Sequence, residues 1–277
     1  MFPYHLVSSS PWPLLMSLSA LIFAIAFVHY LGSLILFGLF SLAIILAAWF
    51  RDLLPSLLAG SHPRIVQLAL IYGFILFLLS EIFLFFSFFW AYFYSALIPS
   101  IELGLWPPIG VESLDPWSIP LMGTLILLSS GATATLAHYG SLSGDKALVL
   151  FALLITILLG IGFIALQLNE YLLSGFSIAD SLFGSAFYLT TGLHGIHVII
   201  GFLFLAAILT AISFDLFSTA HHLALEFALW YWHLVDAVWL LVFLSYYSLP
   251  SILPCIGCYP SLIGAKSMGY LSIMNPS

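Results

Sequence analysis

The amino-acid sequence predicts an all-α integral membrane protein. Of its 277 residues, 63% are hydrophobic and only 5% are charged, whereas a soluble domain is usually about 25% charged. The apolar runs are continuous and do not alternate, which favours membrane helices over the strands of a barrel. The chain has only four Lys and Arg residues, which excludes a nucleic-acid-binding protein because such proteins need many basic side chains for phosphate contacts.

Seven apolar segments are long enough to be membrane spans, since a helix needs about 20 residues to cross a hydrocarbon core of about 30 Å. Only Gly32 and Ser33 separate the first two, so we expect these to form a tight helical hairpin. No internal repeat and no soluble domain is visible. The expected helices span about 14–31, 33–50, 66–98, 118–140, 147–173, 181–213 and 222–248, forming one domain (1–248) that is followed by a C-terminal extension (249–277).

The few basic residues predict the orientation. Arg51 and Arg64 lie between the second and third expected helices, and Lys146 lies between the fourth and fifth. With seven spans, these loops share one side with the N-terminus. By the positive-inside rule this side is the cytoplasm or the mitochondrial matrix, and the C-terminus faces the opposite side. The first residues carry no charged presequence, so we expect insertion through the helices themselves.

Glu81 is the only acid in the apolar, phenylalanine-rich stretch 73–94. The expected helix places it roughly at mid-membrane, where an ionisable group is costly and indicates a functional site. The alternative is a protonated glutamic acid that hydrogen-bonds to a neighbouring helix. Glu170 lies near the end of its helix, where a hydrogen-bonding role is the favoured interpretation.

Histidines and acids recur in the last two expected helices, and their spacing leaves two interpretations open. Imidazole suits iron and copper, so the residues could form a metal site such as the diiron centre of a membrane oxidase. Alternatively, they hydrogen-bond between helices or to lipid headgroups, and the scattered positions of the nine histidines favour this second interpretation. The residues are His194, His197, His221, His222, Glu226, His233 and Asp236.

An ordered set of motifs over about residues 4–248 resembles subunit III of the haem–copper cytochrome c oxidases. No single motif is decisive, but the order of all of them is highly specific. They are YHLVSSSPWP (4–13), WFRDLL (49–54), GFILFLLSEIFLFFSFFWA (73–91), ELGLWPPIGVESLDPW (102–117), LILLSSGATATLAH (125–138), TILLGIGFIALQLNEY (156–171), IADSLFGSAFYLTTGLHGIHVIIG (178–201) and HHLALEFALWYWHLVDAVWLLVFLSYY (221–247).

The resemblance implies a non-redox subunit of an aa3-type oxidase, respiratory complex IV. That complex reduces oxygen with electrons from cytochrome c and pumps protons. In the family, a V-shaped, phospholipid-filled cleft separates the first two helices from the other five, and the subunit packs against subunit I. The subunit stabilises the catalytic core, binds phospholipid and supports proton uptake. Haem a, haem a3, CuA and CuB are expected in partner subunits, and none in this chain.

The resemblance also implies roles for particular residues. Glu81 matches the family's reactive membrane glutamate and is expected to be a functional buried acid beside the lipid cleft. No catalytic residue and no metal ligand is expected. Lipid contacts are expected at His62, Arg64, Trp90 and His197, and polar contacts between helices at Glu170, His194, His221, His222, Glu226, His233 and Asp236.

The chain departs from the family pattern by having fewer basic residues around the second and third helices, where Pro55 and 67–71 stand instead. Fewer cations should weaken contacts to lipid phosphates. The expected location is the mitochondrial inner membrane, with the N-terminus in the matrix and the C-terminus in the intermembrane space; a bacterial plasma membrane is the alternative. Other complex IV subunits, phospholipids and respiratory supercomplexes are candidate partners. The rival functions are a quinol oxidase subunit, a proton channel or transporter, and a diiron enzyme.

Overall fold

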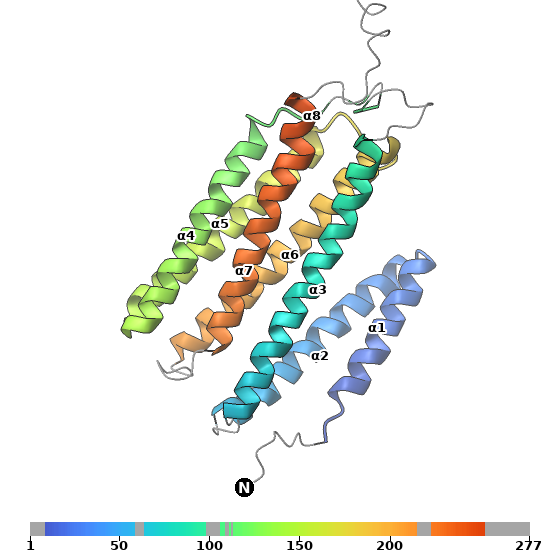
Figure 1. The fold of residues 1–277 in the computed structure, drawn as a ribbon. Coiled ribbons are helices and arrows are strands. Elements are labelled where there is room, and N and C mark those ends of the chain that lie inside the picture. Colours follow the sequence, from blue (N-terminus) through green and yellow to red (C-terminus); the bar gives the residue numbers. More distant parts are fainter. Residues whose placement is uncertain are drawn as a thin grey trace, which may run out of the picture. The chain divides into compact units, whose positions relative to one another are not determined.

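The computed structural model describes residues 9–58, 64–97, 106–108, 111, 113–214 and 223–252, without the side chains of 53–58 and 252. Within these residues the chain is all-α, as predicted (Figure 1). Among the described residues, six helices are long and apolar enough to cross a membrane, and the 17-residue helix α1 is a shorter seventh. The elements are α1 (Trp12–Val28), α2 (Gly32–Leu58), α3 (Arg64–Leu97), α4 (Ile119–Ser143), α5 (Lys146–Leu173), α6 (Ser181–Ser213), α7 (Leu223–Val242), the π-helical turn η1 (Phe243–Ser248) and α8 (Leu249–Ile252).

The chain divides into two compact units, Met1–Leu76 and Phe77–Ser277, with the division inside α3. The lipid-filled cleft expected beside the first two helices stays a prediction, as does the separate extension after residue 248. The helical path continues to Ile252, and residues 253–277 lie outside the described part of the chain.

The first unit contains the expected helical hairpin of α1 and α2. Gly38 makes a close crossing possible, because a Cβ atom at this position would lie 2.9 Å from Phe23 Cα. Near the other end of the hairpin, the indole N–H of Trp12 donates to Asp52 Oδ2 at 2.8 Å. A glycine contact and a tryptophan–carboxylate hydrogen bond therefore hold the two helices together.

In the second unit, α4, α5, α6 and α7 form a ring in which each helix packs on two others. Trp232 of α7 lies in the middle of this ring and is fully buried. Its indole N–H donates to Ser130 Oγ of α4 at 3.0 Å. The indole also faces a glycine on α5 and a glycine on α6. A Cβ atom added to Gly160 would lie 2.6 Å from the indole, and one added to Gly201 would lie 2.9 Å from it. One side chain thus contacts all three other helices, and two glycines make room for it.

The last expected helix does not run as one α-helix to residue 248, because it changes to the π-helical turn η1. In η1 the N–H of Leu249 donates to Leu244 O, five residues back. The next donor in this pattern would be residue 250, but Pro250 has no N–H, so Ser245 O lacks that partner. The hydroxyl of Tyr92 on α3 donates to Ser245 O at 2.8 Å instead, and thereby ties α3 to the end of α7.

Candidate functional site

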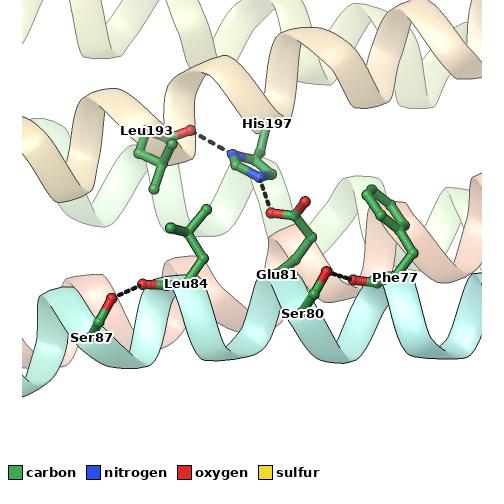
Figure 2. Close-up of polar contacts among 7 residues, drawn as sticks. All are labelled: Phe77, Ser80, Glu81, Leu84, Ser87, Leu193 and His197. Carbon is green, nitrogen blue, oxygen red and sulfur yellow. Dashed lines mark hydrogen bonds and ion pairs between the residues drawn. The ribbon is translucent and has the colours of Figure 1, made fainter.

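Glu81 on α3 and His197 on α6 lie directly opposite each other (Figure 2). His197 Nε2 is 2.8 Å from Glu81 Oε2, and His197 Nδ1 is 2.8 Å from the carbonyl oxygen of Leu193. Leu193 is four residues before His197, so its carbonyl lies under the imidazole on the same side of the helix. Helix α6 therefore fixes the ring with its own backbone, and α3 brings the carboxyl group to the free ring nitrogen.

The Leu193 carbonyl determines which nitrogen of His197 carries a proton. A carbonyl oxygen only accepts, so Nδ1 is the donor and must be protonated. Two arrangements then satisfy the bond to Glu81: a protonated carboxyl group that donates to a neutral imidazole, or an imidazolium that donates to a carboxylate. Both contain one proton between Nε2 and Oε2, and both have a net charge of zero. The pair can therefore hold a proton in the membrane without adding a net charge.

Aromatic side chains surround this pair. The ring of Phe85 meets His197 edge-on with a centroid separation of 5.0 Å, and Tyr231 of α7 stacks on it at 6.2 Å. The His197 side chain is 9% exposed and the Glu81 side chain is 18% exposed. The imidazole is thus enclosed, while the Glu81 side chain is partly exposed. His197, expected as a lipid contact, lies against Glu81 in the structure.

A second histidine–glutamate pair joins α4 to α7. His138 Nε2 is 2.8 Å from Glu226 Oε1, so Glu226 makes a contact between helices, although the sequence did not identify His138 as its partner. Asp236 and His233 lie further along α7. Asp236 is buried, yet its Oδ1 atom has no hydrogen-bond partner within the described part of the chain. A Cβ atom on Gly131 of α4 would be 2.7 Å from Asp236 Oδ2, so glycine makes this close approach possible.

Two further residues named from the sequence are buried and bonded between elements. Glu170 of α5 is only 3% exposed, and the hydroxyl of Tyr247 in η1 donates to its Oε1 at 2.5 Å. His194 Nε2 lies 3.2 Å from the backbone oxygen of Val235 on α7, and the other ring nitrogen has no partner among the described residues. Glu170 thus lies in the last turn of α5, where it is buried inside the protein and accepts a hydrogen bond.

The remaining sequence-named residues stand apart from these pairs. Arg64 and Trp90 are exposed, and Trp90 is 64% exposed. The part of the chain that the structure describes contains no group of three or more His, Cys, Asp or Glu side chains arranged to hold a metal ion. Three of the named histidines, His62, His221 and His222, fall outside that part.

The fold and the paired polar residues define a polytopic helical membrane protein with histidine–glutamate contacts between its helices. The sequence model of the family described as cytochrome c oxidase subunit III matches residues 2–251. The chain is 48% identical over 252 residues to cytochrome c oxidase subunit 3 of Arabidopsis thaliana, covering 88% of this chain and 95% of the relative. The same protein of Prototheca wickerhamii is 46% identical (88% and 97% covered), and that of the sea urchin Paracentrotus lividus is 45% identical (88% and 96% covered).

The chain therefore belongs to the cytochrome c oxidase subunit III family, as the ordered motifs predicted. It is part of an oxidase complex, complex IV, and a multi-pass protein of the mitochondrial inner membrane. This membership selects the oxidase subunit over the transporter and the diiron enzyme considered from the residues alone.

Proposed function

We propose that this chain is a non-catalytic subunit that stabilises the core of cytochrome c oxidase, packs against subunit I and supports proton uptake into it. The complex reduces oxygen with electrons from cytochrome c and pumps protons, with haem a, haem a3, CuA and CuB in the partner subunits. The observation that carries the proposal is the Glu81–His197 pair. It joins α3 to α6 by a hydrogen bond that needs one proton, and it does so in an aromatic, membrane-embedded setting.

The geometry suits Glu81 to exchange this proton. Its side chain is partly exposed, whereas His197 is enclosed and held by Leu193. If the proton leaves and is not replaced, a carboxylate faces the lone pair of Nε2, and the hydrogen bond is lost. The hydrogen bond between α3 and α6 therefore depends on the proton that the carboxyl group would exchange, which links this contact to the supply of protons.

Phospholipid is the proposed neighbour of the exposed residues. Arg64 and His62 would contact lipid phosphates, because a cation near the headgroups is attracted to them. Trp90 presents an exposed amphipathic ring of the kind that lies among lipids. We further propose that the N-terminus faces the matrix and the C-terminus faces the intermembrane space, as the positions of Arg51, Arg64 and Lys146 predict.

The test replaces Glu81 by glutamine in the assembled oxidase. In E81Q the amide N–H donates to His197 Nε2, so the contact between α3 and α6 is kept while the exchangeable carboxyl proton is lost. We expect unchanged assembly, slower proton uptake and a severalfold faster loss of activity during turnover. The control is E170Q, since an amide oxygen at Glu170 still accepts from Tyr247 and this acid has no proposed role in proton uptake.

The measurements are proton uptake by purified oxidase in vesicles and the decay of oxygen consumption with the number of turnovers. If E81Q and E170Q both behave like the unmodified oxidase, Glu81 is a structural residue and the proton-supporting role is wrong. If E170Q is impaired as much as E81Q, a loss of packing explains both results and the Glu81–His197 pair has no special role.

A further inference from the structure

Ionisable side chains follow the line along which α4 and α7 pack, and the function proposed above uses none of them. We name this line the α4–α7 seam and define it by His138 of α4 and by Glu226, His233 and Asp236 of α7. At about 1.5 Å per residue, the step from Glu226 to Asp236 covers about 15 Å. This length is about half the thickness of a 30 Å hydrocarbon core.

Part of the seam is open at the surface of this chain. His233 is exposed, and 40% of the His138 side chain is exposed. Within the described part of the chain, the ring of His233 forms no hydrogen bond. Since the hydrocarbon region offers no hydrogen-bond partners, an imidazole that faced lipid here would leave its donor and its acceptor unsatisfied.

The outward face of α5 shows what this chain presents to lipid. Between positions 148 and 168 the exposed residues of α5 all carry hydrocarbon side chains; they include Phe151, Leu154, Leu158, Ile161 and Leu168. The same chain therefore has one face that suits lipid and one that does not. This contrast indicates that another protein surface covers the α4–α7 seam.

Asp236 lies one turn from the exposed His233 on α7. It is only 8% exposed, and its Oδ1 atom has no partner among the described residues. Buried polar atoms without a partner are rare in native structures. Asp236 is three residues from His233, so the two lie on the same side of α7. The Oδ1 atom is enclosed within this chain, so of the two side chains it is the exposed ring of His233 that is open to a partner.

We propose that the α4–α7 seam is the docking face for a membrane-spanning helix of another subunit of the oxidase. That helix presents a hydroxyl, amide or carboxyl side chain at the depth of His233, which both donates and accepts. Two of the neighbouring exposed residues are small: Ala237 lies one turn after His233 on α7, and Thr135 lies on α4, whereas the exposed Trp230 one turn before His233 is large. Small residues let membrane helices approach closely. The inference rests on the proposed core-stabilising function, because it names the face through which the chain holds its partner.

Photo-crosslinking in the assembled oxidase tests the proposal. A photoreactive phenylalanine analogue replaces Leu240, which is exposed two turns from His233, or Leu158 on the lipid-suited face of α5 as the control. We expect a covalent adduct between position 240 and a different subunit, and adducts with lipid alone from position 158. Adducts with lipid alone, or with a second copy of this chain, from position 240 would overturn the proposal.

A second measurement keeps the test decisive if the crosslinker disturbs assembly. A237W places a bulky ring beside His233, and L158W places the same ring on α5. We expect A237W to reduce severalfold the amount of this chain that co-purifies with the haem-containing core, with its helix content unchanged, and L158W to have no effect. Full retention of A237W contradicts docking at the seam. A lipid-only adduct at position 240 in a complex whose E81Q variant still loses proton uptake overturns the docking face and leaves the proposed function intact.

Discussion

Two glycines on α5 give a sharp test of how the four-helix ring is packed. A methyl group added at Gly160 would lie 2.6 Å from Cη2 of Trp232, whereas one added at Gly162 has nothing within 4 Å. Both changes to alanine gain about 1 kcal/mol of helix propensity. In G162A nothing opposes this gain, so we expect a variant that is more stable than the unmodified chain.

In G160A the packing opposes the same gain. Carbon atoms prefer separations of about 3.5–4.0 Å, so the indole of Trp232 would have to shift by about 1 Å. It cannot move freely, because Trp232 is fully buried and its indole N–H is bonded to Ser130 Oγ at 3.0 Å. Overpacking of this kind costs about 1–3 kcal/mol. We therefore expect G160A to be less stable than G162A by about 1–3 kcal/mol.

The free energy of unfolding of the purified chain, measured by titration from mild detergent micelles into SDS with circular dichroism as the signal, checks this difference. A rescue experiment tests the cause: W232F removes the atoms that the new methyl group meets, so G160A should cost less in a W232F background, by a coupling of about 0.5–3 kcal/mol. Equal stability of G160A and G162A, or no rescue by W232F, would refute the packing at the centre of the ring.

Two further predictions concern the ends of the helices. Y92F removes the hydroxyl that donates to Ser245 O, and we expect it to lower the free energy of unfolding by about 1–2 kcal/mol. Y94F is the control, because it alters an exposed ring, and its free energy of unfolding should stay within about 0.5 kcal/mol of that of the unmodified chain. In the loop before α6, the Ser177 N–H donates to Asp180 Oδ2 at 2.6 Å, and this bond holds the pKa of Asp180 below its ordinary value. A carboxyl group whose pKa is lowered by folding stabilises the folded chain at pH values above its ordinary pKa, and this stabilisation is lost in acid. The unmodified chain should therefore have a higher thermal stability than D180N near neutral pH, and the two should converge as the pH falls below about 3. A difference that persists in acid would contradict the role of the carboxylate.

The sequence was sufficient to predict the helices, because the length of each helix follows from the thickness of the bilayer. Runs of apolar residues longer than the hydrocarbon core must be helical to satisfy their backbone groups. Local chemistry also marks the boundaries: Asp145, which separates α4 from α5, accepts from the N–H of Leu148 at 3.0 Å and caps α5. The expected and observed bounds therefore agree within a few residues for most helices.

The partners of the buried residues could not be predicted in the same way, because they depend on how the helices are rotated and shifted against each other. His194 and His197 are three residues apart, so the sequence suggests that they belong to one group. Three residues rotate a helix by about 300°, which leaves the two side chains about 60° apart. That angle is enough to direct His194 to the backbone of α7 and His197 to Glu81 on α3.

The π-helical turn η1 also could not be predicted from the sequence. Pro250 is its only local signal in the sequence, and a proline near the end of an apolar run usually indicates that the helix stops. Here the helical path continues, because the hydroxyl of Tyr92, 153 positions earlier in the chain, supplies the missing donor to Ser245 O. No local pattern can predict a bond between residues so far apart.

The π-helical turn also affects which side of the helix each later residue faces. A π-helical turn accommodates one residue more than an α-helical turn of the same path, so every position after η1 is rotated by about 100° from where a continuous α-helix would place it. Tyr246 and Tyr247 are consecutive, yet their hydroxyls reach Thr190 on α6 and Glu170 on α5. Deleting one residue between 243 and 248 would restore an ordinary α-helix without shortening its span appreciably, but would place one of these tyrosines in the position of the other. The end of α7 is thus sensitive to the number of residues before it as well as to their identity.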